Sequence, residues 1–145
     1  MTSASTSSIP HAPREAPALT GMADAVLAEI AARMEDYIET GRSAAIELTA
    51  MPLTNEDRAD LEVRLGRGEV AVTIESAGHS EIWETRFSGV WFVRHFGEGD
   101  RVATESVEIA EAPLIVRSHP ADMRAAARRL AALCAEQSAC MPHDA

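Results

Sequence analysis

The chain has 145 residues with 46% hydrophobic and 25% charged content, which is ordinary for one soluble globular domain. Its formal charge of −10, from 23 acidic and 13 basic residues, argues against general nucleic-acid binding, which needs a basic surface. No stretch is apolar enough for a membrane helix, and the N-terminus lacks the apolar core of a secretory signal. We therefore expect a cytoplasmic protein whose charged partner, if it has one, is basic. The alternative is that the acidity serves only solubility.

The chain divides into three parts by composition. Residues 1–18 are rich in Ser, Thr, Ala and Pro and show no periodicity, which predicts a disordered N-terminal tail. Periodic patterns begin after them, so we expect a single domain over residues 19–138. Residues 139–145 then form a short C-terminal tail.

The first half of the domain predicts a helix, a strand and a second helix. Apolar residues recur every three or four positions over 21–40, and Gly41 follows where helices commonly stop. Alternating apolar residues at 44–51 predict a strand. Thr54 then has the character of an N-cap, with Asp57 three residues on in a near-capping-box arrangement. A short helix should follow and end near residue 65.

The second half predicts strands and a last helix. Two-residue alternation and short turns indicate strands over residues 70–75, 81–87, 90–96 and 102–109. Such short connections imply an antiparallel meander. Pro120 suits the first position of a helix. Its apolar stripe comprises Met123, Ala127, Leu130, Ala131 and Cys134.

These elements predict an α+β fold, with an antiparallel four- to five-stranded sheet (a meander) covered on one face by two or three helices. The other face must be solvated or occupied by a partner. Trp83 and Trp91 both fall on strands. The pattern favours core packing for them, while a large aromatic on the open face would mark an interaction surface.

No pattern of catalytic residues stands out. The sequence contains no glycine-rich phosphate loop and no nucleophile elbow, and its histidines sit at no metal-ligand spacing. We therefore expect no enzyme, no bound cofactor and no metal site. Cys134, Cys140 and His143 offer too few ligands for an ordinary zinc site. They leave one alternative open, a metal or iron–sulfur delivery protein.

One string of residues between 51 and 109 stands out by its order and spacing, which together are more specific than any single piece. It comprises Met51-Pro52-Leu53-Thr54, Asp57, Leu61, Leu65-Gly66-Arg67-Gly68-Glu69-Val70, Glu84-Thr85, Phe87, Gly89-Val90-Trp91 and Val93-Arg94. This region resembles the C-terminal conserved region of hydrogenase expression/formation proteins of the HupH type, also called HoxQ or HyaF.

The resemblance implies an accessory maturation factor or chaperone for a nickel–iron hydrogenase. Such a factor would bind the small-subunit precursor during iron–sulfur cluster assembly and before export, together with other maturation proteins. It implies neither nucleic acid nor membrane as a partner, and it allows a homodimer. Family members are often about twice as long, so this chain resembles a single copy of the conserved region.

The resemblance and the charge pattern together suggest where a partner would bind. The resemblance implies a small-subunit precursor with a twin-arginine export signal. Such a signal is basic at its start and apolar beyond, so acidic and aromatic residues would complement it. The candidate partner-binding residues are Arg67, Glu69, Glu84, Arg86, Trp91 and Arg94. Under the alternative interpretation the motif is structural: Gly66, Gly68 and Gly89 shape turns, and Trp91 packs in the core.

Overall fold

The computed structural model describes residues 18–76 and 78–139. The predicted N-terminal tail therefore lies outside the described residues except for Ala18. The predicted C-terminal tail lies outside them except for Ala139.

Three helices and five strands make up the described chain. The helices are α1 (Met22–Thr40), α2 (Asn55–Leu65) and α3 (Pro120–Ala139). The strands are β1 (Ala44–Glu47), β2 (Ala71–Glu75), β3 (His79–Glu84), β4 (Val90–Phe96) and β5 (Val102–Ile109). Two 3-10 turns, η1 (Glu98–Asp100) and η2 (Leu114–Val116), flank β5.

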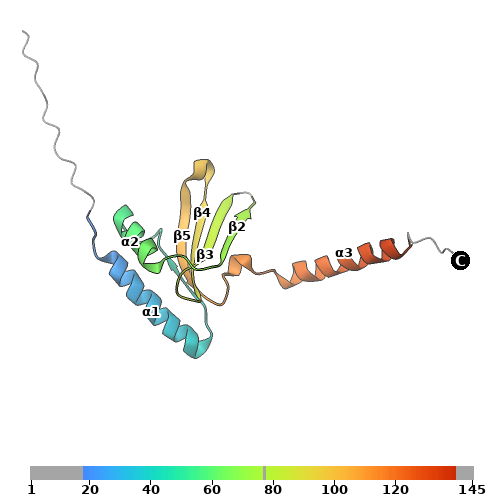
Figure 1. The fold of residues 1–145 in the computed structure, drawn as a ribbon, viewed down its shortest axis with the longest axis horizontal. Helices are drawn as coiled ribbons and strands as arrows, with labels where there is room; N and C mark the ends of the chain where they lie inside the picture. Colours follow the sequence, from blue (N-terminus) through green and yellow to red (C-terminus); the bar gives the residue numbers. More distant parts are fainter. Residues whose placement is uncertain (1–17, 77, 140–145) are drawn as a thin grey trace, which may run out of the picture.

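The five strands form one open sheet in the order β1-β5-β4-β3-β2. Every neighbouring pair is antiparallel. Strands β2 to β5 follow one another as a meander (Figure 1). Strand β1 precedes them in the chain and pairs with β5, so it lies at one edge of the sheet. The predicted α+β class and antiparallel meander are therefore confirmed.

Helices α1 and α2 lie against one face of the sheet, the helix-covered face (Figure 1). The main core fills the space between these two helices and the sheet. The apolar stripe of α1 meets the side chains from alternate strand positions there. Its buried residues are Ala23, Val26, Ile30, Ile46, Leu48, Leu61, Leu65, Trp83, Val90, Phe92, Val107 and Ile109.

The opposite face, the open face, carries a smaller apolar cluster of Ile82, Trp91 and Val93, against which Val116 of η2 packs. Helix α3 extends away from the sheet and covers neither face (Figure 1). Two helices therefore cover the sheet, which agrees with the two or three expected.

The start of α2 holds α1 in place. Thr54 and Asp57 form a complete capping box, as the sequence predicts. The same Asp57 carboxylate accepts hydrogen bonds from Thr20 Oγ1 at 2.6 Å and from Thr20 N at 2.9 Å, just before α1 begins. The hydrogen bond from the Thr20 hydroxyl, against the opposing effect of burial, lowers the pKa of Asp57 from 3.8 to about 2.

Strand β3 differs from the prediction of residues 81–87, because it begins at His79 and ends at Glu84. The ladder with β4 ends there because Val90 N donates to Phe87 O of the turn at 3.0 Å. Gly68 N donates to Glu84 O at 2.7 Å, and Arg86 N donates to Leu65 O at 3.0 Å. Phe87, predicted to share a strand face with Trp83, is consequently exposed.

Candidate protein-binding site

Two of the six candidate binding residues, Arg67 and Arg94, meet over one aromatic ring. The Trp83 ring is buried and stacks on Phe92 with 4.7 Å between centroids. The Arg67 guanidinium lies 4.0 Å from the Trp83 ring centroid, and that of Arg94 lies 5.2 Å from it. Both cations therefore stabilise the helix-covered side of the sheet through cation–π contacts.

Arg94 also belongs to a chain of ion pairs between α2 and the sheet. Arg94 Nε donates to Glu105 Oε2 at 2.7 Å, and Arg94 Nη2 donates to Glu62 Oε2 at 2.9 Å. Arg58 Nη1 reaches the other oxygen of Glu105 at 2.9 Å. Arg67 Nη2 approaches Glu62 at 3.5 Å. Because Glu105 is buried, this arrangement ties α2 to β4 and β5.

Arg86 lies at the C-terminal end of α2. Its Nη2 donates to Arg64 O at 2.9 Å, which satisfies one of the last carbonyls of the helix. Gly66 turns there with φ +65, and a Cβ at Gly66 would run into the Arg86 side chain. A Cβ on Gly68 would lie 2.6 Å from Thr85 O. A larger residue at Gly66 would have to adopt a positive φ and displace the Arg86 side chain, whereas at Gly68 it would meet the backbone.

The remaining candidates lie apart from this group. Glu84 is half-buried at the end of β3, and its Oε1 accepts a hydrogen bond from Gly89 N at 2.9 Å. Trp91 is buried on the open face and donates Nε1–H to Ala110 O at 3.0 Å. Glu69 is exposed in the segment between α2 and β2. The structure brings Arg67 and Arg94 together but does not bring all six residues onto one surface.

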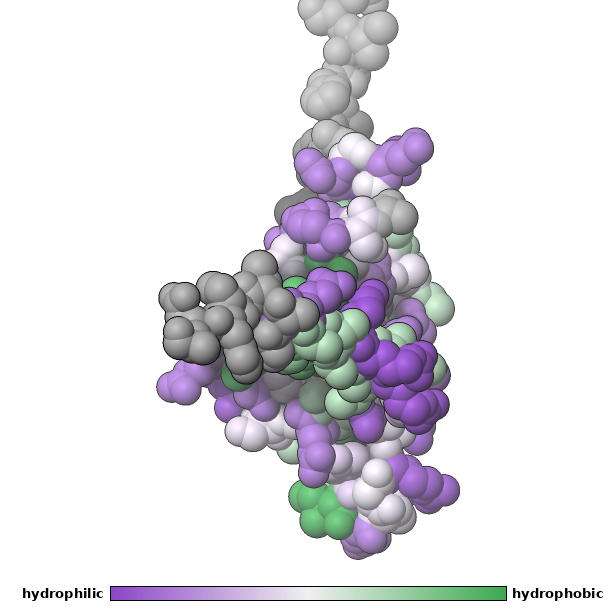
Figure 2. All heavy atoms as spheres, turned by 90° about the vertical axis from the view of Figure 1, so that its right-hand side faces the viewer, coloured by the Kyte–Doolittle hydropathy of each residue, from purple (hydrophilic) through white to green (hydrophobic). Residues whose placement is uncertain are grey.

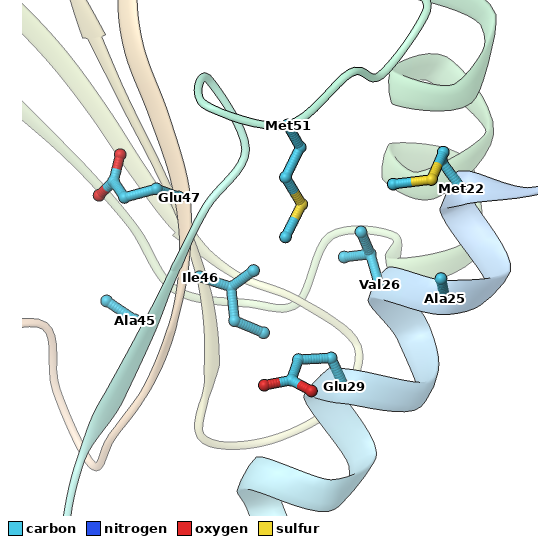
Figure 3. Close-up of a pocket in the computed structure, with 8 residues that line it drawn as sticks. All are labelled: Met22, Ala25, Val26, Glu29, Ala45, Ile46, Glu47 and Met51. Atoms are coloured by element: carbon cyan, nitrogen blue, oxygen red, sulfur yellow. The ribbon is translucent and has the colours of Figure 1, made fainter.

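A groove that the sequence did not suggest lies between α1 and the edge strand β1 (Figure 3). It encloses about 480 Å³. Met22 and Val26 of α1, Ile46 of β1 and Met51 of the following loop point into it. Unbranched methionine side chains adapt to varied apolar partners. The groove is therefore suited to apolar side chains from another molecule.

The free edge of β1 runs along this groove. Among the strands within residues 18–76 and 78–139, β1 pairs with β5 alone, in a register that sets Ile46 opposite Val107, and Leu48 N donates to Glu105 O at 2.8 Å. Bonded and non-bonded positions alternate in an antiparallel pair. The N–H and C=O groups of Ala45 and Glu47 consequently point away from β5. Both residues are exposed and line the groove.

The rim of the groove is acidic. Glu29 points across the gap from α1 (Figure 3) and bonds to Arg33 at 2.7 Å. Glu47 projects from β1 on the open-face side and is exposed. Within the described ranges, no side chain forms an ion pair with Glu47. The sequence predicts the strand itself, but its place at the sheet edge depends on pairing with β5, whose residues Ser106 to Ile109 lie far along the chain.

Helix α3 presents its predicted apolar stripe to solvent. From residue 120 to 137 every side chain is exposed except the half-buried Ala125. Seen from the side toward which α3 points, hydrophobic residues alternate with hydrophilic ones on the surface (Figure 2). Cys134 lies exposed on this helix, while Cys140 and His143 fall outside the described residues.

Two searches of the described residues bear on function class. Within residues 18–76 and 78–139, His, Cys, Asp and Glu side chains form no group of three or more able to hold a metal ion. In the same ranges, no helix has the length and apolar character needed to span a bilayer.

Together these features define a small α+β domain with an open antiparallel sheet and an apolar groove beside a free strand edge. The chain belongs to the family described as HupH hydrogenase expression protein, C-terminal conserved region, whose model matches residues 21–137. The resemblance seen in the sequence is therefore confirmed. A solved structure, the hydrogenase expression protein HupH from Thiobacillus denitrificans, is 39% identical with a TM-score of 0.78. The match covers 82% of this chain and 99% of that one.

Two curated relatives are similar over shorter shares of their own length. The hydrogenase expression/formation protein HoxQ of Azotobacter vinelandii is 31% identical over 86 residues, which is 59% of this chain and 30% of the relative. The hydrogenase expression/formation protein HupH of Rhizobium leguminosarum bv. viciae is 29% identical over 123 residues, which is 85% of this chain and 43% of the relative. The chain thus spans less than half of each of these relatives.

Proposed function

We propose that this protein is an accessory factor in the maturation of a nickel–iron hydrogenase, and that it acts by binding the small-subunit precursor in the cytoplasm. The observation that carries the proposal is the family match over residues 21–137. Relatives named as hydrogenase expression/formation proteins support it. In this role the domain holds the precursor while its iron–sulfur clusters are assembled and before it is exported.

The geometry supports a binding role over a catalytic one. The candidate residues with the closest contacts, Arg67 and Arg94, are engaged with Trp83 and Glu62 inside the domain. The groove beside β1 instead offers apolar side chains, free backbone groups and an acidic rim. Those are features of a surface that recognises a polypeptide.

Co-purification tests the proposal. The full chain is expressed with a nickel–iron hydrogenase small-subunit precursor, once with its export signal and once without it. A stable complex that forms only with the signal supports a chaperone that holds the precursor before export. A complex that persists without the signal supports action on the mature subunit. Failure of both forms to bind would overturn the proposal.

Two charge-reversal variants show which surface of the chain binds the precursor. Glu69 is exposed and engages no other described side chain in an ion pair, so Glu69→Arg changes the surface charge without disturbing the fold. The sequence-based hypothesis predicts weaker precursor binding for this variant. If binding is unchanged while Glu47→Arg weakens it, the binding surface lies at β1 instead.

A further inference from the structure

We infer that the edge of β1 and the groove beside it bind an extended segment of the partner by strand addition, a segment in which apolar and basic residues alternate. This inference rests on the proposed function for the identity of the partner, but its geometry is independent of that identity. Strand addition is a common mode of peptide recognition, in which backbone hydrogen bonds supply affinity and side-chain pockets supply specificity.

The backbone of β1 provides the hydrogen-bonding groups. Ala45 and Glu47 direct their N–H and C=O groups away from β5, and both residues are exposed. Natural edge strands are commonly protected by shortness, charged side chains, proline or a bulge. Strand β1 has four residues and one exposed charge, Glu47, but no proline interrupts Ala44–Glu47 and the register with β5 is continuous. The edge is therefore open to a further strand.

The two faces of β1 determine which residues the added strand should carry. The residue of the added strand opposite Ile46 would face the groove, where Val26, Met22 and Met51 would surround an apolar side chain. Its residue opposite Glu47 would point to the open face, because side chains alternate along a strand. Opposite charges directly across a strand pair stabilise it. Alternation of apolar and basic residues follows from these two requirements.

The electrostatic complement extends beyond Glu47. Glu108 of β5 lies opposite Ala45 on the open face and is half-buried. Among the residues that the structure describes, neither Glu47 nor Glu108 has an ion-pair partner. A basic side chain on the added strand would supply one for each. This charge complementarity selects a basic extended segment over an uncharged one.

The second sheet edge provides an internal control. In the part of the chain that the structure describes, β2 pairs with β3 alone, and Glu84 N donates to Val70 O at 2.9 Å, so the backbone groups of Ala71 point outward. Proline is tolerated at an outward-facing edge position but removes the N–H there. Ala45→Pro and Ala71→Pro are therefore the same change at matched positions of two edges, only one of which borders the groove.

The test uses the full chain and two short capped peptides of about six residues, enough to cover β1 at about 3.3 Å per residue. One alternates Arg and Leu, and the other has the same composition with all Arg before all Leu. We expect the alternating peptide to bind at least about tenfold more tightly. Ala45→Pro should abolish this difference, and Ala71→Pro should leave it within about twofold. Unchanged circular dichroism would show that each variant folds.

Amide hydrogen exchange identifies the mode of binding. Strand addition should protect the amides of Ala45 and Glu47 when the alternating peptide binds. Equal binding of the two peptides, or no new protection at these amides, would overturn the inference. So would protection already present in the free protein together with no peptide binding, because the edge would then be occupied by this chain or a second copy.

The hydrogenase precursor separates this inference from the proposed function. If the precursor binds and Ala45→Pro affects it no more than Ala71→Pro, the inference fails and the proposed function stands. If the alternating peptide binds at β1 and the precursor does not bind, the strand-addition site stands and the proposed function fails.

Discussion

Glu105→Gln should destabilise the protein far more than the same substitution at an exposed glutamate. The Glu105 side chain is 5% exposed and is contacted by two guanidinium groups, of Arg58 at 2.9 Å and Arg94 at 2.7 Å. The amide of glutamine keeps one acceptor oxygen but turns a donor toward the second guanidinium. One charge-assisted hydrogen bond is then lost, and two cations lose their shared countercharge.

The magnitude follows from the burial of the three partners. Removing one member of a fully buried ion pair costs about 3–5 kcal/mol. Arg58 and Arg94 are partly exposed, at 28% and 18%, and Arg94 keeps its bond to Glu62. Water and Glu62 therefore compensate in part. We expect a decrease of about 2–4 kcal/mol in the free energy of unfolding, scaled from the fully buried case.

The matched control is Glu29→Gln. Glu29 forms a bond of the same length, 2.7 Å, to Arg33, but both side chains are about half exposed. Exposed pairs of this spacing contribute about 0.3–0.5 kcal/mol. Urea denaturation of the two variants measures both values. Equal losses for Glu105→Gln and Glu29→Gln would refute the argument that burial makes the Glu105 network structural.

Three other outcomes are expected. The pKa of Asp57 is lowered to about 2, so its stabilising contribution is present above pH 3.8, its ordinary pKa, and is lost as the pH falls toward 2. In acid titrations followed by circular dichroism, the difference in stability between wild type and Asp57→Asn should shrink over that range. A constant difference would contradict this prediction. Leu61→Ala should lower the free energy of unfolding by about 2–5 kcal/mol in urea denaturation, because Leu61 is fully buried. Leu130→Ala on α3 should change it by less than about 0.5 kcal/mol, because Leu130 is exposed. Similar losses for the two variants would place α3 against the core. The double variant Cys134→Ser and Cys140→Ser should bind the precursor as wild type does, and loss of binding would favour the metal-delivery alternative.

Much of the fold could be predicted because its signals are local. The capping box of Thr54 and Asp57 and the two-residue alternation of β4 and β5 are each visible within a few residues. The end of β3 could not be predicted this way. Thr85 and Phe87 continue the alternation of Trp83, but Val90 N bonds to Phe87 O in the turn and Arg86 N bonds to Leu65 O. A turn bond and a long-range bond therefore override the local pattern.

The apolar stripe of α3 shows a different limit of sequence reasoning. Its spacing predicts an amphipathic helix, and the helix Pro120–Ala139 forms. Periodicity gives the face of a helix that avoids water but not the surface that covers it. In this structure Met123, Leu130 and Leu133 are more than half exposed. The pattern predicts the helix, while the packing of that helix depends on information outside the segment.

The candidate site was difficult to predict because the most specific motif in the sequence builds structure. Gly66 has a positive φ beside the Arg86 side chain, Gly68 lies against the backbone of Thr85, and Arg94 bonds to the buried Glu105. These residues are distinctive because few alternatives satisfy their geometry. A binding surface made of free backbone groups leaves no such signature, since any residue supplies an N–H and a C=O. The edge at Ala45 and Glu47 is therefore recognised only once the strand order is known.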